Sequence, residues 1–278
     1  VSRPLPTAAA TTWEEVVSPG VFTHGVGMDP VDPDRMFVGT WGRGLYRTVD
    51  GGQTWLGDSG SFTHDGGVVT TYDVVLDPAD PNRGVATTRN GTYVTTTRGA
   101  LWSRHPQNNG GAPLSAYDIA LLPDGSGVAI SELASNFGGG KLWIYDWATD
   151  LFSVGTASDR LVALDGESTL GIGFTVDGTM LFGHTTTVYV TSDLGSTLVR
   201  NGAGLPDFQP RSVVPDPEIQ GVTLCAVDGG LYRQTSIGDP WTLFGSSLPT
   251  PVRDMLHHPQ DADVMFATTN MGVYRSDD

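Results

Sequence analysis

Three aspartates occupy the same place in a segment that recurs along the chain. They stand in TYDVVLDP (Asp73), AYDIALLP (Asp118) and VRDMLHHP (Asp254), where a short apolar run leads to a turn with proline. Aligned on these turns, three more copies place Gly25, Gly171 and Ser212 at the same position. If the copies surround one axis, the carboxylates meet and raise one another's pKa, as acid and base catalysis requires. Alternatively a sugar or a cation sits among them, or each carboxylate accepts backbone N–H groups and water fills the space between.

The neighbours of these positions have side chains suited to ligand binding. The residues directly before them are His24, Tyr72, Tyr117, Leu170, Arg211 and Arg253. Loops elsewhere in the repeats add Trp41, Arg43, Glu132 and His184. An aromatic ring beside hydrogen-bonding groups suits sugar recognition, because the ring packs on the apolar face of a pyranose. We expect Trp41 to make this contact; the alternative is that it packs on the next repeat.

The elements that position these residues are predicted to be short strands, four to a repeat. A turn recurs as TVDGGQTW (48–55), TTTRGALW (95–102), TSDLGSTL (191–198) and QTSIGDPW (234–241). Each copy follows an apolar strand such as GLYR or VYVT, and two strands joined by a turn rich in Asp, Pro and Gly precede that strand. The copies recur at a period of roughly 40 to 50 residues, which with four strands is typical of a propeller blade.

The two ends of the chain resemble complementary parts of one repeat. The chain stops at YRSDD, which aligns with Tyr46 to Asp50, and Thr12-Trp13 aligns with Thr54-Trp55. Residues 11–18 are therefore predicted to form the outer strand of the last blade and to leave no open sheet edge. The sequence predicts an all-β fold in which residues 1–278 form a single six-bladed β-propeller domain. The expected blades are 21–58, 69–105, 115–157, 168–205, 209–247, and 251–278 with 11–18.

The recurring turn, Ser/Thr-x-Asp-x-Gly-x-Thr-Trp, resembles the Asp-box, or BNR, repeat. The longer unit DPVDPDRMFVGTWGRGLYRTVDGGQTW (29–55) resembles blades of xyloglucanase-like glycoside hydrolases, sortilin-type receptors and photosystem II assembly factors. The resemblance covers essentially the whole chain and implies a propeller. It does not select a function, because these relatives include enzymes, receptors and assembly factors. It also implies that the boxes lie on outer strands, so that Asp50, Asp193 and Trp55 are structural.

The sequence departs from the catalytic patterns of the enzyme families. Sialidases that share the Asp-box need an arginine triad, a Tyr/Glu pair and an aromatic-Arg-aliphatic-Pro motif, whereas this chain begins with Val1-Ser2-Arg3-Pro4. Xyloglucanase-like enzymes carry a catalytic Asp in a loop of the form RTDIGGAYR, and here GTWGRGLYR places Trp41 and Gly42 there. Those enzymes also form their cleft between two propellers. No residue role is therefore transferred from either family.

Composition limits the partners. The net charge of −16 would repel phosphate backbones, so neither nucleic acid nor an anionic membrane is an expected partner. No apolar run approaches the roughly 18 residues of a membrane span, so membrane insertion is not expected. A single cysteine, Cys225, excludes an internal disulfide and a Cys-based metal site, and the histidines lack metal-ligand spacing, so we expect no metal and no cofactor. We expect a monomer. The chain starts at Val1 and not at Met, which either a processed export signal or trimming of the chain explains; the location is left open, with a secreted or cell-surface one favoured.

These observations predict a ligand-binding propeller that recognises a glycan or a protein segment at the rim of the central channel. The ligand-binding candidates are Trp41, Arg43, His24, Tyr72, Tyr117, Arg211, Arg253 and His184. The alternative is a glycoside hydrolase, sialidase-like or xyloglucanase-like, with acid and base chosen from Asp73, Asp118, Asp254 and Glu132. A third hypothesis is an assembly factor or receptor.

Overall fold

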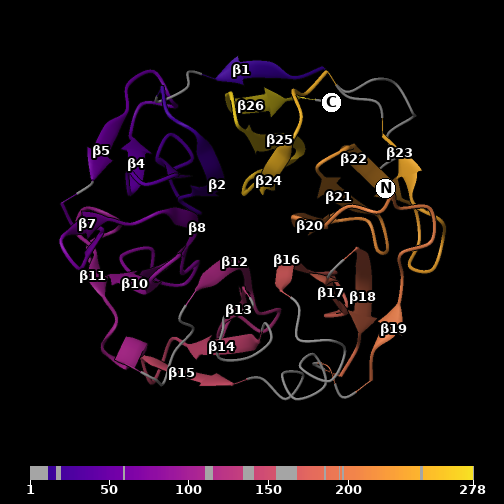
Figure 1. Cartoon of the computed structure of the whole chain (residues 1–278), viewed down its shortest axis with the longest axis horizontal. Coiled ribbons are helices and arrows are strands. Elements are labelled where there is room, and N and C mark those ends of the chain that lie inside the picture. The colour runs from indigo at the N-terminus through magenta and orange to yellow at the C-terminus, as the bar shows by residue number, and fades with distance from the viewer. Residues whose placement is uncertain are drawn as a thin grey trace.

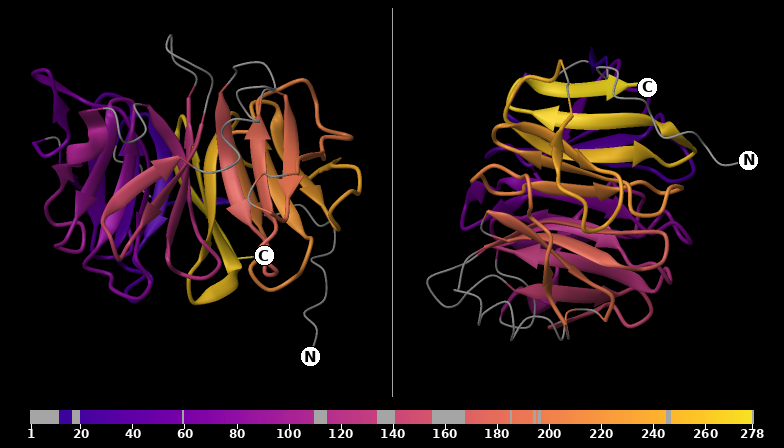
Figure 2. Two further views of the ribbon diagram at one scale, coloured as in Figure 1. Left: turned by 90° about the horizontal axis from the view of Figure 1, so that it is seen from below. Right: turned by 90° about the vertical axis from the view of Figure 1, so that its right-hand side faces the viewer.

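Six four-stranded antiparallel sheets surround a central axis and form a six-bladed β-propeller (Figure 1). The computed structural model describes residues 12–16, 20–58, 60–109, 115–133, 141–154, 168–184, 186–193, 195, 197–244 and 247–277. One edge strand of each sheet faces the centre, and the strands run roughly along the axis of the ring (Figures 1 and 2). The predicted fold class is confirmed.

The first three blades occupy the first half of the chain. Blade one is β2 Thr23–Met28, β3 Met36–Thr40, β4 Leu45–Thr48 and β5 Leu56–Asp58. Blade two is β8 Thr71–Leu76, β9 Gly84–Thr88, β10 Gly91–Thr95 and β11 Ser103–Arg104. Blade three is β12 Ala116–Leu121, β13 Gly127–Glu132, β14 Leu142–Asp146 and β15 Leu151–Val154.

The remaining blades follow in the same order around the ring. Blade four is β16 Thr169–Phe174, β17 Met180–His184, β18 Thr187–Thr191 and β19 Val199–Arg200. Blade five is β20 Ser212–Pro215, β21 Thr223–Val227, β22 Gly230–Gln234 and β23 Thr242–Leu243. Blade six is β24 Val252–His258, β25 Asp261–Thr269, β26 Gly272–Ser276 and, from the start of the chain, β1 Glu14–Val16.

Two small elements lie between blades. A hairpin of β6 (Thr63–His64) and β7 (Gly67–Val68) precedes blade two, where the sequence had indicated only a spacer. A 3-10 turn, η1, spans Pro106–Asn109 after β11. Within the ranges given above, no helix is both long enough and apolar enough to cross a bilayer.

Strand β1 closes the ring as the sequence predicted. Glu14 pairs with Arg275 and Val16 pairs with Val273, so the beginning of the chain forms the outer edge of the sheet made by its end. Trp13, just before β1, is buried in the apolar cluster between blades five and six. Closure thus combines main-chain pairing with burial of a large aromatic side chain.

Apolar clusters fill the interfaces between adjacent blades. One joins blade one to blade two around Phe37 and Trp102, and another joins blade six to blade one around Val26 and Phe266. Comparable clusters lie at the other four interfaces. Because each sheet is apolar on both faces, a blade gains most of its burial from its neighbours, and the ring is stable only when complete.

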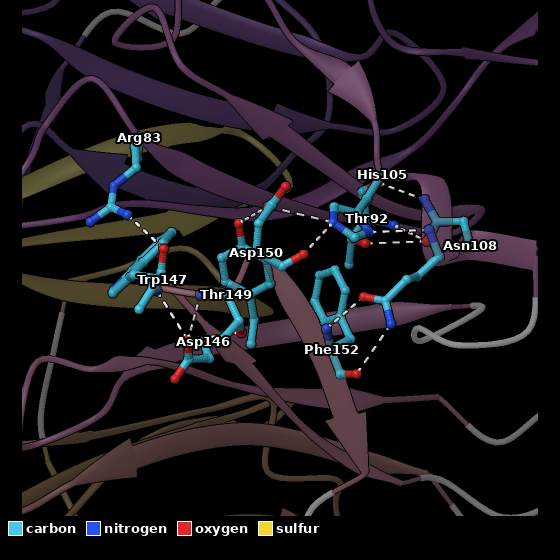
Figure 3. A network of polar contacts seen from close by, with 12 residues as sticks. Arg83, Thr92, His105, Asn108, Asp146, Trp147, Thr149, Asp150 and Phe152 are labelled. Carbon is cyan, nitrogen blue, oxygen red and sulfur yellow. Dashed lines mark hydrogen bonds and ion pairs between the residues drawn. The ribbon is translucent and has the colours of Figure 1, made fainter.

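Polar contacts add to this packing at the edges of the interfaces (Figure 3). Between blades two and three, Arg83 donates from Nη1 to the carbonyl oxygen of Trp147 at 2.6 Å, and its guanidinium lies over the Trp147 ring. The amide N–H of Phe152 donates to Gln107 Oε1 at 2.7 Å. These contacts connect η1 and the turn before β9 to blade three, so segments outside the strands are themselves part of the interface.

The recurring turn after the third strand has a defined hydrogen-bond pattern. Asp50 accepts the N–H of Thr54 at 2.9 Å and the hydroxyl of Thr48 at 2.6 Å. Asp193 repeats the pattern with Thr197 and Thr191, at 2.8 and 2.7 Å. In both turns the carboxylate holds the loop between the third and fourth strands closed, far from the centre of the ring, which agrees with a structural role.

Candidate functional site

The three aspartates singled out in the sequence meet at the centre of the ring. Asp73, Asp118 and Asp254 are all buried, on the innermost strands of blades two, three and six. We call them the carboxylate ring. At the matching position of blade one, a Cβ on Gly25 would lie 2.0 Å from the carbonyl oxygen of Tyr72, so only glycine fits there. The register inferred from the proline turns is therefore the register of the structure.

Each of two aspartates links its own blade to the next one. Asp118 accepts the N–H of Ile119 at 2.9 Å and the N–H of Ile172, on blade four, at 2.8 Å. Asp254 accepts the N–H of Met255 at 2.7 Å and that of Val26, on blade one, at 3.0 Å. These contacts are the capping role that the sequence left open beside catalysis.

The innermost strands are irregular at this height, which explains the free N–H groups. The pairing of β2, β8, β12, β16 and β24 with their second strands shifts register beside the aspartates. A register shift leaves residues out of the ladder, and their backbone groups need other partners. The carboxylates provide those partners.

Burial raises the pKa of all three carboxyl groups, and repulsion by neighbouring carboxylates raises the pKa of Asp73 and Asp118 further. Burial, followed by the charges of Asp254 and Asp118, raises the pKa of Asp73 well above its usual range. Burial and Asp254 raise the pKa of Asp118 to about 8, and burial raises that of Asp254 to about 6. A hydrogen bond between Asp73 and Asp118 raises the pKa of the former and lowers that of the latter. These directions favour Asp73 as the carboxyl group that carries the proton shared by the pair.

A hollow of about 500 Å³ opens at one end of the channel, above the carboxylate ring. We call it the rim funnel. It is lined by Phe22, His24, Trp41, Tyr72, Tyr117, Leu133, Ser168, Leu170, Gln209, Arg211, Arg253 and Asn270. A chamber of about 10 Å³ separates it from the carboxylate ring, with His24, Tyr72, Tyr117 and the two arginines on one side and the three aspartates on the other.

An arc of aromatic rings forms one side of the rim funnel. Trp41 stacks on His24 with ring centres 5.5 Å apart and an angle of 24° between the planes. Tyr72 meets His24 edge-on at 5.1 Å and lies 5.1 Å from Tyr117. Burial, followed by the charges of Arg253 and Arg211, lowers the pKa of His24 to about 4. The imidazole is therefore neutral at neutral pH and can act as an uncharged hydrogen-bonding group.

Two arginines, from blades five and six, also line the rim funnel. Arg211 donates from Nε to Asp228 Oδ1 at 2.5 Å and from Nη2 to Oδ2 at 2.9 Å, so it is held by a two-point ion pair. Arg253 donates from Nε to Asn270 Oδ1 at 2.9 Å. The hydrogen bond to Arg211 is the main cause that holds the pKa of Asp228 below its usual range. The rim funnel thus combines flat rings with fixed positive charge.

A second hollow, of about 390 Å³, adjoins the rim funnel at the junction of blades six and one. We call it the seam groove; it is lined by Gly20, Val21, Phe22, Trp41, Arg43, Asn270 and Met271. Three of its apolar side chains are highly exposed: Phe22 at 63%, Trp41 at 55% and Met271 at 64%. Trp41 borders both hollows.

The opposite end of the channel is different in character. A cavity of about 290 Å³ there has apolar walls that include Val26, Val74 and Leu121, and the carboxylate ring forms part of its lining. The aspartates thus lie at the waist of the channel and do not line the rim funnel.

Two predicted residues lie away from these hollows. Glu132 ends β13, where it is buried and accepts a hydrogen bond from Trp143 Nε1 at 2.8 Å. His184 ends β17, is buried, and lies 6.2 Å from the ring of Tyr189. Arg43 lines the seam groove and not the rim funnel.

Other residues of the rim funnel were not anticipated. Phe22, Gln209, Leu133 and Ser168 lie just before an innermost strand or just after a second strand, which are the same loops that supplied the predicted residues. Their types carry no chemical signal, so only the loop position could have pointed to them.

Among the described residues, no group of three or more His, Cys, Asp or Glu side chains is arranged to hold a metal ion.

Comparison with known proteins identifies the fold. No family model matches the sequence, and no curated protein matches it. Solved structures do match. A gluconolactonase from Xanthomonas campestris is 13% identical, with a TM-score of 0.68 over 95% of this chain and 88% of that one.

Two further solved structures are similar to this chain. YCF48 bound to a D1 peptide is 14% identical, with a TM-score of 0.57 over 99% of both chains. An ancestral GH74 enzyme is 14% identical, with a TM-score of 0.61 over 96% of this chain and 46% of that one, so the chain spans about half of that enzyme. At these identities, what is shared is the propeller fold.

Proposed function

We propose that the protein binds a glycan in the rim funnel and that Trp41 is the platform for a sugar ring. The observation that carries the proposal is the exposed Trp41 ring, which is held in one orientation by stacking on the buried His24. An exposed indole costs free energy in water, and a preordered ring gains binding energy without losing side-chain freedom on association. Neutral His24, Tyr72 and Asn270 supply hydrogen-bonding groups around it.

The test is a panel of neutral and acidic oligosaccharides, with calorimetry on those that bind. We expect Trp41→Ala to weaken binding at least about 10-fold, because a central aromatic anchor is lost. Trp41→Phe should retain part of the affinity because it keeps a flat ring. The matched control is Leu101→Ala, which truncates a side chain that is 66% exposed outside the site.

Failure of every glycan in the panel to bind would contradict the proposal. Binding that is unchanged by Trp41→Ala would place the sugar elsewhere.

The exposed Phe22 and Met271 beside Trp41 favour a second candidate ligand, a peptide with apolar side chains in the seam groove. The structural neighbour YCF48, solved with a D1 peptide, supports this candidate.

A glycoside hydrolase is the second candidate activity, favoured by the proton that Asp73 shares with Asp118 beneath the rim funnel. Against it, the Asp118 and Asp254 carboxylates already accept backbone N–H groups, and none of the three aspartates lines the rim funnel. We expect no release of reducing ends from any bound glycan. Turnover that disappears in the double variant Asp73→Asn, Asp118→Asn, with circular dichroism showing a folded protein, would establish the hydrolase instead.

A further inference from the structure

Two arginines line the rim funnel, and the same carboxylate pairs with both of them. Arg211 and Arg253 are close enough that the charge of Arg211 lowers the pKa of Arg253, after burial as the larger cause. Their shared counterion is Asp228, whose Oδ1 lies 2.5 Å from Arg211 Nε and 4.0 Å from Arg253 Nη1. Guanidinium groups remain charged in proteins, so two positive charges share one carboxylate.

Arg253 also has N–H groups that make no hydrogen bond to the described residues. Its Nε is used by Asn270, and among the described residues no acceptor lies within hydrogen-bond distance of its two Nη atoms. The side chain is nonetheless largely buried, at 19% exposed, and it lines the rim funnel. A guanidinium that is partly desolvated and incompletely paired can gain strongly from an anionic acceptor.

The Arg253 guanidinium and the Trp41 ring, the proposed sugar platform, line the same hollow. Asn270, which fixes Arg253, lines both the rim funnel and the seam groove, and Trp41 lines both as well. A ligand ring on Trp41 therefore has a guanidinium in the wall of the hollow that holds it.

We propose that Arg253, backed by Arg211, is a subsite for a negatively charged substituent, so that the glycan bound is an acidic sugar. This inference rests on the proposed function. The charged substituent is a carboxylate, as in a uronic acid, or a sulfate ester. Both offer coplanar or paired oxygens to the two Nη atoms, and Trp41 and Arg253 then recognise the sugar ring and its charge separately.

The experiment compares matched ligands by calorimetry at low salt. The probes are trigalacturonate against its methyl ester, and a sulfated galactose oligosaccharide against its unsulfated form. We expect at least one acidic probe to bind about 10-fold or more tightly than its neutral partner, and added salt to reduce that difference. The pair that shows the preference identifies the substituent.

Variants of Arg253 test whether this side chain causes the preference for the acidic probe. Arg253→Gln should abolish the preference, so that the acidic probe and its neutral partner bind with similar affinity. Arg253→Lys, which keeps the charge without the planar fork, should retain part of it. The control Arg275→Gln removes the same charge from an exposed arginine that pairs with Asp277 and should change nothing.

The outcomes separate this inference from the proposed function. If the neutral probes bind through Trp41 with the same affinity as the acidic probes, the acidic subsite is wrong and the proposal of glycan binding still stands. A preference that survives Arg253→Gln would also overturn the subsite. If no probe of either kind binds, glycan binding and the subsite are both wrong.

Discussion

Replacing Trp13 with alanine is expected to destabilise the folded protein by about 3–5 kcal/mol. The Trp13 side chain is buried between blades five and six, against residues that include Leu248, Met255 and Met265. Truncation loses the burial of the indole and leaves a cavity at the junction where the two ends of the chain meet. Because β1 adds only three residues of pairing to β26, Trp13 supplies much of what holds the last blade closed. The measurement is the free energy of unfolding in urea.

A second tryptophan is the natural control for this prediction. Trp41 is 55% exposed, so Trp41→Ala should change the free energy of unfolding by less than about 1 kcal/mol. If Trp13→Ala unfolds at the same urea concentration as the wild type, β1 does not close the ring in solution. The same pair of variants also separates stability from binding, because Trp41→Ala is the one expected to lose the ligand.

The architecture could be predicted from the sequence because the repeat recurs at nearly constant spacing. Proline turns gave the register of the innermost strands, and that register brought Asp73, Asp118 and Asp254 together. The same reasoning placed His24 and Arg253, one residue earlier, around a common hollow. Period and register are properties of the main chain, and side-chain direction at a given height follows from them.

Other features depend on contacts that no spacing encodes. Glu132 and His184 were expected in loops but end strands β13 and β17, where their side chains are buried. The two-point pairing of Arg211 with Asp228 leaves Arg253 incompletely paired, which requires knowing how far apart three side chains lie. The hairpin at 63–68 forms in a stretch without alternating apolar residues. In each case a tertiary contact, and not local pattern, decides the outcome.

The role of the carboxylate ring was left undecided by the sequence because catalysis and capping require the same residue type. The structure shows capping: the N–H groups of Ile172 and Val26 reach across to Asp118 and Asp254 from the next blade. The carboxylate ring also has a consequence for stability that neither the catalytic nor the capping hypothesis included. Its carboxyl groups share protons within the folded protein, so the stability of the propeller depends on pH.

The free energy of unfolding should fall by about 3–4 kcal/mol between pH 6.5 and pH 8. The pKa of Asp118 is raised to about 8, and that of Asp73 well above its usual range, so the folded protein retains protons that the unfolded chain has released. A raised acid pKa gives stability that is complete below the unfolded pKa and is lost as the pH rises through the folded one. The lowered pKa of His24, about 4, acts in the opposite sense only below its unfolded value of 6.5, outside this window.

Two isosteric variants test which carboxyl group holds the proton. Asp73→Asn replaces the proton donor with an amide that can still donate to Asp118, so it should flatten the pH dependence and make the protein more stable than the wild type at pH 8. Asp118→Asn must turn an amide N–H toward the N–H of Ile119 or Ile172, so it should cost about 1–3 kcal/mol at every pH. Urea unfolding from pH 6.5 to pH 9 measures both. A wild type whose stability is constant over this range would show that the ring is fully ionised, and equal losses in the two variants would show that Asp73 does not hold the shared proton.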